Sequence, residues 1–295
     1  MPYAWHAHPD VWVLMAGLLV GYFWALRRFG PRHTAPGQPV ATRLQKVCWV
    51  SGVVTLWVAA DWPVHDLAER YLYSVHMTQH MLITLVAPPF LLLGTPAWLA
   101  RELLAPPRLY RVVRRLARPM PALLLFNGLL VVTHWPAFVD NTVQSELLHF
   151  SAHAAIFGSA LLMWCPVVAP LPEMRPLSAP AQMLYLFLQS IVPTVPSAFL
   201  IFADRPIYKF YEHVPRLWGL SAGEDQRIAG LLMKLGGGFL LWMVIAVLFF
   251  KWHAAEEEND RQARHWRDLE RELDQGLAGG TGVPPGRENP TRWTG

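Results

Sequence analysis

Four histidines in the sequence form two pairs that could bind a transition metal. His76 and His80 form one pair, and His149 and His153 form the other. Both pairs have the i, i+4 spacing that places two imidazoles on one face of a helix, about one turn apart. Imidazole nitrogen is a good ligand for copper, zinc, iron and nickel. The spacing predicts that each pair can share one ion and that the two pairs together form one metal site.

Other potential ligands are expected to lie near these pairs. Met77 and Met81 each follow a histidine of the first pair, and their thioether sulfur is a soft donor that favours Cu(I). Methionine at such positions also serves simply as apolar filler, so we regard the two thioethers as optional. The residues that we expect to add a ligand or to support one are His134, Glu146, Asp61, His65, Met77 and Met81.

The elements that must position these side chains are predicted to be membrane-spanning helices. The 295 residues are 53% hydrophobic and only 16% charged, a balance typical of a membrane protein. Seven stretches approach the roughly 20 apolar residues that a helix needs to cross a bilayer. They are Val11–Phe29, Val47–Ala60, His76–Leu99, Pro121–Val139, Leu147–Val168, Ala181–Phe202 and Ile228–Phe250. We therefore expect an all-α fold, a polytopic membrane helix bundle of about seven transmembrane helices.

The distribution of basic residues predicts how this bundle is oriented. Of the 25 Lys and Arg residues, 19 fall in segments that are cytoplasmic if the N-terminus lies outside, and five fall in the opposite segments. Because cytoplasmic loops retain positive charge, we expect an N-out/C-in topology. Both histidine pairs then begin helices that enter from the outside. All four imidazoles should therefore lie near the outer face and point into the bundle, away from lipid.

The domain organisation follows from the same pattern. Residues 1–252 are expected to form the seven-helix transmembrane domain, and residues 253–295 a charged cytoplasmic tail that is partly disordered, because its end is rich in Gly and Pro. Met1 to Asp10 lack the basic region of a signal peptide, so the first apolar run should remain in the membrane. The net charge of +4 is spread over short runs, which argues against a nucleic-acid partner.

Catalytic motifs are missing from the sequence. It contains no His-Glu-x-x-His, no phosphate-binding glycine loop and no Gly-x-Ser-x-Gly, so we do not expect an enzyme. Two proline pairs, Pro88 with Pro89 and Pro193 with Pro196, interrupt the third and sixth stretches and predict kinks. Such kinks either shape the bundle or open a cavity in it.

Several segments resemble the polytopic CtaG family, assembly factors for caa3-type cytochrome c oxidase. The run HMTQHMLITLVAPPFLLLGTP, His76–Pro96, is similar to the family's signature, and LLHFSAHAAIFGSALLMWCPV, Leu147–Val167, is similar to its second histidine pair. ADRPIYKFY and GLSAGEDQRIAGLLMK, Gly219–Lys234, also agree. The resemblance extends over nearly all of Tyr71–Lys251. Lys234 departs from the pattern, in which an aromatic residue is expected.

This resemblance implies a membrane protein of the bacterial plasma membrane that is needed to assemble a haem-copper cytochrome c oxidase. Its partners would be oxidase subunits and the lipid bilayer, and it would bind or deliver copper, with His76, His80, His149 and His153 as ligands. Two alternatives remain open. Histidines from facing helices could ligate a haem, as in a membrane cytochrome, or the protein could be a metal-free membrane scaffold.

Overall fold

The structure is a computed structural model that describes residues 5–142, 145–174 and 176–279. The described residues form helices joined by short connections, which confirms the predicted all-α fold. Contacts divide the chain into two units, with the boundary between Leu248 and Phe249. The predicted disorder at the end of the tail concerns residues 280–295, which lie outside the described residues.

Among the described residues, six helical segments are long and apolar enough to cross a membrane, and a bent helix pair raises the number to seven. The segments are α1 (Pro9–Arg28), α3 (Arg43–Ala60) with α4 (Val64–Arg70), α5 (Tyr73–Met81) with η1 (Leu82–Val86) and α6 (Ala87–Gly94), α11 (Glu146–Val168), α12 (Ala179–Ile191) with α13 (Thr194–Phe202), and α15 (Ala222–Leu231) with η2 (Leu232–Gly236) and α16 (Gly237–Gly279). Short helices α2 (Gly30–His33), α7 (Ala97–Leu103), α10 (Pro136–Thr142) and α14 (Lys209–His213) connect them. The prediction of about seven spans is therefore confirmed as six or seven candidates.

The fourth span differs from its expected form. Instead of one helix over Pro121–Val139, the structure has α9 (Pro119–Thr133), which ends at His134, and it is preceded by α8 (Pro107–Leu116) at a bend of 81°. Pro136 explains the early end, because the residue before a proline is driven out of the helical region. With 15 residues, α9 is shorter than the roughly 20 residues that a single helix needs to cross a bilayer. Its early end leaves His134 at a helix terminus.

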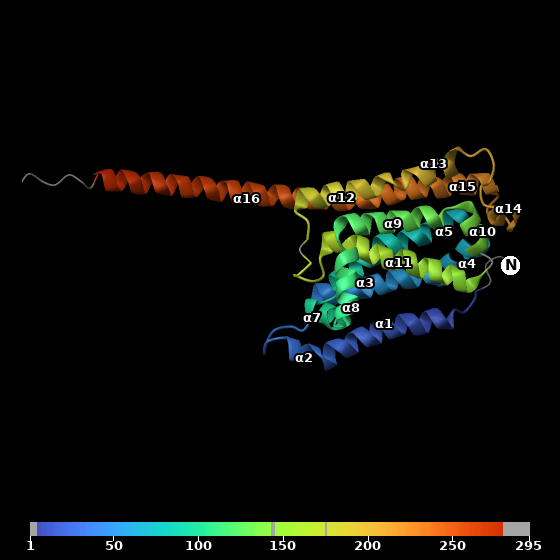
Figure 1. Ribbon diagram of the computed structural model, residues 1–295, viewed down its shortest axis with the longest axis horizontal. Helices are drawn as coiled ribbons and strands as arrows, with labels where there is room; N and C mark the ends of the chain where they lie inside the picture. Colours follow the sequence, from blue (N-terminus) through green and yellow to red (C-terminus); the bar gives the residue numbers. More distant parts are fainter. Residues whose placement is uncertain (1–4, 143–144, 175, 280–295) are drawn as a thin grey trace, which may run out of the picture. The chain divides into compact units, whose positions relative to one another are not determined.

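The third span lies at the centre of the first unit, which ends at Leu248. Its segments α5, η1 and α6 pack against α3, α11 and α15, while α9 packs against α11 and α13 against α15 (Figure 1). The main core cluster joins Trp164 and Met163 of α11 to Leu186 of α12 and Phe126 of α9. This central position gives α5 neighbours on several sides.

The proline pair in the third span produces a π-helical turn. Pro88 and Pro89 have no N–H to donate, so the carbonyl of Thr84 has no backbone partner one turn later. The chain widens into η1, and the indole Nε1 of Trp164 donates a hydrogen bond of 3.1 Å to the Thr84 carbonyl. A polar backbone group buried at membrane depth needs such a partner. The predicted kink is thus a single widened turn that a neighbouring helix stabilises.

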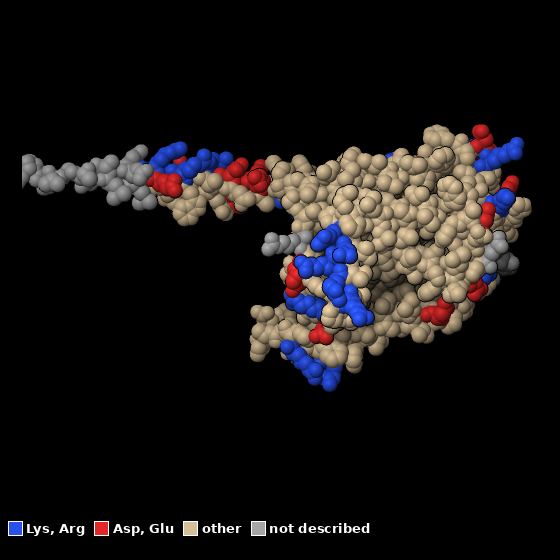
Figure 2. All heavy atoms as spheres, viewed as in Figure 1, with Lys and Arg blue, Asp and Glu red and all other residues tan. Residues whose placement is uncertain are grey.

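Charged side chains are distributed unevenly over the first unit. Figure 2 shows Lys and Arg gathered over α8 at one end, where Arg108, Arg111, Arg114 and Arg115 lie. Acidic side chains, mixed with basic ones, occupy the opposite end (Figure 2). The middle of the surface is almost free of charge in this view, as expected of a bundle surrounded by hydrocarbon.

Candidate metal centre

Three histidines from two spans converge inside the first unit. His76 and His80 of α5 and His153 of α11 each offer a ligand atom, and these three atoms lie within 4.8 Å of one another. The Nε2 atoms of His80 and His153 are 3.1 Å apart. Two nitrogens that bind one tetrahedral ion at about 2.0–2.1 Å are separated by about 3.3 Å. The three residues, called the His triad below, therefore match the spacing of a single metal site.

The two histidine pairs run in the same direction along their helices. The ring centroids of His80 and His153 are 4.9 Å apart, and that of His76 lies 5.6 Å from His153 and 6.0 Å from His149. The i, i+4 neighbours are closer still, at 4.5 Å in the first pair and 4.3 Å in the second. The helical spacing therefore brings all four predicted imidazoles into one cluster.

Within this cluster, His149 has a different partner from the other three. Its Nε2 lies 2.9 Å from the carboxylate Oε1 of Glu69, which is also 3.5 Å from Nε2 of His65. Sequence reasoning missed Glu69, although its i, i+4 spacing from His65 could have pointed to it. The structure thus joins the predicted residue His65 to the cluster through a carboxylate of α4.

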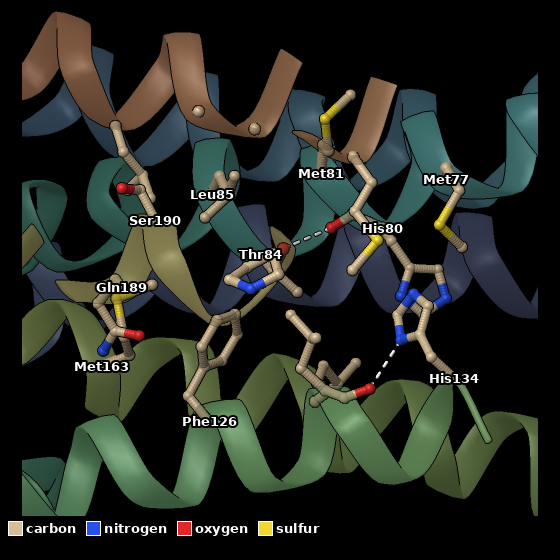
Figure 3. A pocket seen from close by; sticks show the side chains of 17 residues that line it. Met77, His80, Met81, Thr84, Leu85, Phe126, His134, Met163, Gln189 and Ser190 are labelled. Atoms are coloured by element: carbon tan, nitrogen blue, oxygen red, sulfur yellow. Dashed lines mark hydrogen bonds between the residues drawn. The ribbon is translucent and has the colours of Figure 1, made fainter. Parts of the chain in front are cut away.

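His134 supplies a further nitrogen at the edge of the His triad. Its Nδ1 lies 2.7 Å from the carbonyl oxygen of Leu130 and must donate a proton to it, which leaves Nε2 of the neutral ring with a free lone pair (Figure 3). The ring centroid is 6.1 Å from that of His80. Nε2 of His134 and Nδ1 of His76 are buried and have no hydrogen-bond partner among the described residues. Buried polar atoms of this kind are normally satisfied, so both are suited to a ligand.

A small cavity of about 60 Å³ adjoins His80 and His134 (Figure 3). Besides the predicted Met77 and Met81, it is lined by Met163 of α11 and Met233 of η2, which the sequence analysis did not single out. Nothing in the sequence distinguishes those two from other apolar residues of their helices. The cavity is large enough for a few water molecules or an ion, and its sulfur atoms come from three spans.

Two of the predicted supporting residues lie elsewhere. Asp61, at the end of α3, accepts hydrogen bonds from the indole nitrogens of Trp12 and Trp57, each at 2.7 Å, and so holds α1 against α3. Glu146 is exposed in the first turn of α11, and the carboxylate that reaches His149 belongs to Glu69 instead. Neither residue belongs to the group of side chains whose ligand atoms converge.

A buried carboxylate on α15 fixes the start of α5, the helix that carries His76 and His80. The residue before α5 provides no side-chain cap, and Asp225 instead accepts hydrogen bonds from the backbone N–H groups of Tyr73 and Ser74, at 2.8 and 3.0 Å. Unpaired N–H groups at a helix N-terminus need such an acceptor. The neighbouring Gln226 binds the N–H of Ile207 and the carbonyl of Leu200. The motif GEDQ thus links three segments around the site.

Comparison with known proteins agrees with the resemblance found in the sequence. A family model described as cytochrome c oxidase caa3 assembly factor matches residues 20–255. An uncharacterized protein of Mycobacterium leprae is 25% identical over 241 residues, which cover 74% of this chain and 36% of that protein. Uncharacterized proteins of Mycobacterium bovis and Mycobacterium tuberculosis are each 25% identical over 272 residues, which cover 84% of this chain and 39% of theirs.

This chain therefore spans less than two fifths of the length of these relatives. No solved structure matches it. The family model covers far more than half of the sequence, including every segment around the histidine cluster. The chain belongs to the family of cytochrome c oxidase caa3 assembly factors.

Proposed function

We propose that this protein assists the assembly of a haem-copper cytochrome c oxidase by holding a copper ion at the His triad and passing it to an oxidase subunit. The observation that carries the proposal is the convergence of His76, His80 and His153 within 4.8 Å in a member of an oxidase assembly family. His134 and the methionines of the cavity are available as further donors. The copper ion is cargo, and the family membership supplies its destination.

Copper in its monovalent form suits this set of donors better than zinc. The three imidazoles and the thioethers of the cavity are neutral, so no anion within the triad offsets the cost of burying a divalent ion. A single positive charge reduces that cost, and soft thioether sulfur favours Cu(I). Strong thiolate ligands would retain the ion, but neutral ligands can bind it and still release it.

The geometry disfavours a haem. Two axial imidazoles on opposite sides of one iron would hold their nitrogens about 4 Å apart, twice a metal–nitrogen bond of about 2.0 Å, whereas Nε2 of His80 and Nε2 of His153 are 3.1 Å apart. The adjoining cavity of about 60 Å³ is also far smaller than the several hundred cubic ångströms of a typical cofactor pocket.

Metal analysis of the purified protein, combined with its absorption spectrum, tests the proposal. We expect about one Cu(I) per chain after loading under reducing conditions, and no Soret band. A Soret band would support the cytochrome alternative. Protein that retains neither copper nor haem would support a metal-free scaffold, which is the outcome that contradicts the proposal.

We further propose that the histidine cluster lies near the outer face of the bacterial plasma membrane. Arginines of α8 gather at the end of the first unit that should then face the cytoplasm (Figure 2). Reporter fusions after Arg118 and after Lys251 should read as cytoplasmic, and a fusion near Asn141 as external. An external reading after Lys251 would contradict the orientation and place the cluster at the inner face.

A further inference from the structure

We propose that Glu69 is the loading ligand of the His triad: a copper ion reaches the triad along a line of donors formed by His65, Glu69, His149 and His153. The inference rests on the proposed function, since it requires the triad to hold copper. It adds the route by which the ion enters, and it assigns a role to a carboxylate outside the triad.

The distances between successive donors carry the argument. An ion that forms bonds of about 2.0–2.1 Å can touch two donors at once only if they lie within about 4 Å of each other. His65 Nε2 and Glu69 Oε1 are 3.5 Å apart, and Glu69 Oε1 and His149 Nε2 are 2.9 Å apart. His149 and His153 lie one turn apart on α11, and their ring centroids are 4.3 Å apart. From His153, Nε2 lies 3.1 Å from Nε2 of His80. An ion can therefore bind His65 and Glu69 together, then Glu69 and His149 together, and at the end His153 and His80 together. The adjacent rings of His149 and His153 connect these pairs.

This line leads from a polar surface to the interior. The side chains of His65 and Glu69 are 26% and 32% exposed, while that of His149 is 16% exposed. Beyond His65 lies the N-terminal segment, where the rings of His8 and His65 are 5.2 Å apart and His8 Nε2 is 3.0 Å from Asp66. The outer end of the line is thus open to water and rich in groups that attract a cation.

Glu69 is the anion among the four donors of the line, and its charge suits a loading step better than a storage site. A carboxylate near the opening raises the local concentration of cations and offsets part of the cost of removing an ion from water. The His triad is neutral, so the ion separates from the negative charge of Glu69 when it moves to the triad. His65, Glu69 and His149 do not form a converging group of three ligand atoms, so the ion is passed along this segment and not retained.

The exchange steps balance without a redox reaction. At each step one metal–ligand bond forms and one breaks, and copper stays Cu(I). The ion binds His149 through Nε2, whose lone pair is available when the neutral ring carries its proton at Nδ1. No net proton is consumed.

The test measures how fast, and how tightly, the purified full-length protein takes up Cu(I) from a coloured Cu(I)–chelator complex. Glu69→Gln keeps the shape and hydrogen-bonding capacity of the side chain but removes its charge. We expect copper uptake to slow by about tenfold or more, while the copper content and affinity at equilibrium stay within about threefold of the parent protein. Glu212→Gln removes the same charge from an exposed side chain of α14 that is not one of the four donors, and it should load at the parent rate.

The possible results separate the route from the proposed function. Parent protein that binds no Cu(I) overturns both. If the parent protein binds copper and Glu69→Gln loads equally fast, the proposed route is overturned and the proposed function is not. Glu69→Gln that loads less copper at equilibrium also overturns it, because Glu69 would then be a ligand of the final site. If the glutamine variant does not fold, Glu69→Asp keeps the charge but is shorter by one methylene. Its carboxylate then no longer reaches His149, so it should also load more slowly, to an unchanged endpoint.

Discussion

We expect the double variant His80→Ala/His153→Ala to lose copper binding and oxidase assembly while it still inserts into the membrane. Their Nε2 atoms lie 3.1 Å apart, and their removal leaves the triad with His76 alone. Loss of residues that merely support a metal ligand lowers affinity by about 10–100-fold, so loss of two ligands should lower it further. The measurements are copper content of the purified protein, oxidase activity of the membranes, and abundance of the variant.

A matched control is His213→Ala, which removes an exposed imidazole on α14 whose Nδ1 lies 2.8 Å from the carbonyl oxygen of Lys209 in its own turn. It should leave copper content and oxidase activity unchanged. Met77→Leu should have a smaller effect than loss of a histidine, because leucine fills a similar volume and the other sulfur atoms of the cavity remain. Full oxidase assembly by the double variant at limiting copper would refute the copper proposal and leave only a membrane scaffold.

Much of the cluster could be predicted because helical geometry is local. The i, i+4 spacing fixes where two imidazoles lie on one helix, whatever the rest of the chain does. That two such helices meet followed from the need to keep ionisable groups away from lipid. The structure accordingly brings His76, His80, His149 and His153 together, with His134 close to them.

The grouping within the cluster could not be predicted in the same way. Whether His149 faces the triad or Glu69 depends on how far α4 and α11 are shifted along each other, which no spacing within one helix encodes. Met163 lies on α11 and Met233 lies within the π-helical turn η2, and both line the cavity because of how these segments pack against the third span. A π-helical turn moves every later side chain around its helix, so a prediction based on regular 3.6-residue turns loses accuracy beyond it.

The fourth span illustrates a different limit of prediction from sequence. Hydropathy alone extends it from Pro121 to Val139, because the residues around His134 are apolar enough. The backbone ends α9 at His134, ahead of Pro136. Proline geometry outweighed hydropathy here, and it gave His134 the terminal position from which Nδ1 reaches the Leu130 carbonyl.

The second large effect is expected for Asp225→Ala, which removes the cap of α5. Asp225 is 1% exposed, and its two oxygens accept the backbone N–H groups of Tyr73 and Ser74. A buried donor without a partner costs about 1–3 kcal/mol, and this substitution leaves two of them in a protein whose total stability is of the order of 5–15 kcal/mol. We expect a marked fall in membrane abundance and a lower thermal midpoint of the purified protein.

Two comparisons separate loss of the cap from loss of a charge. Asp225→Asn keeps one accepting oxygen and should fall between the parent protein and Asp225→Ala. Glu224→Ala removes the neighbouring exposed carboxylate, which caps its own helix through Ser221, and should lower stability less than Asp225→Ala does. Parent-like stability of Asp225→Ala would mean that α5 holds its position without the cap. If Asp225→Ala instead folds but binds copper weakly, then the cap acts on the site itself, because His76 lies one turn from the N–H groups that Asp225 holds.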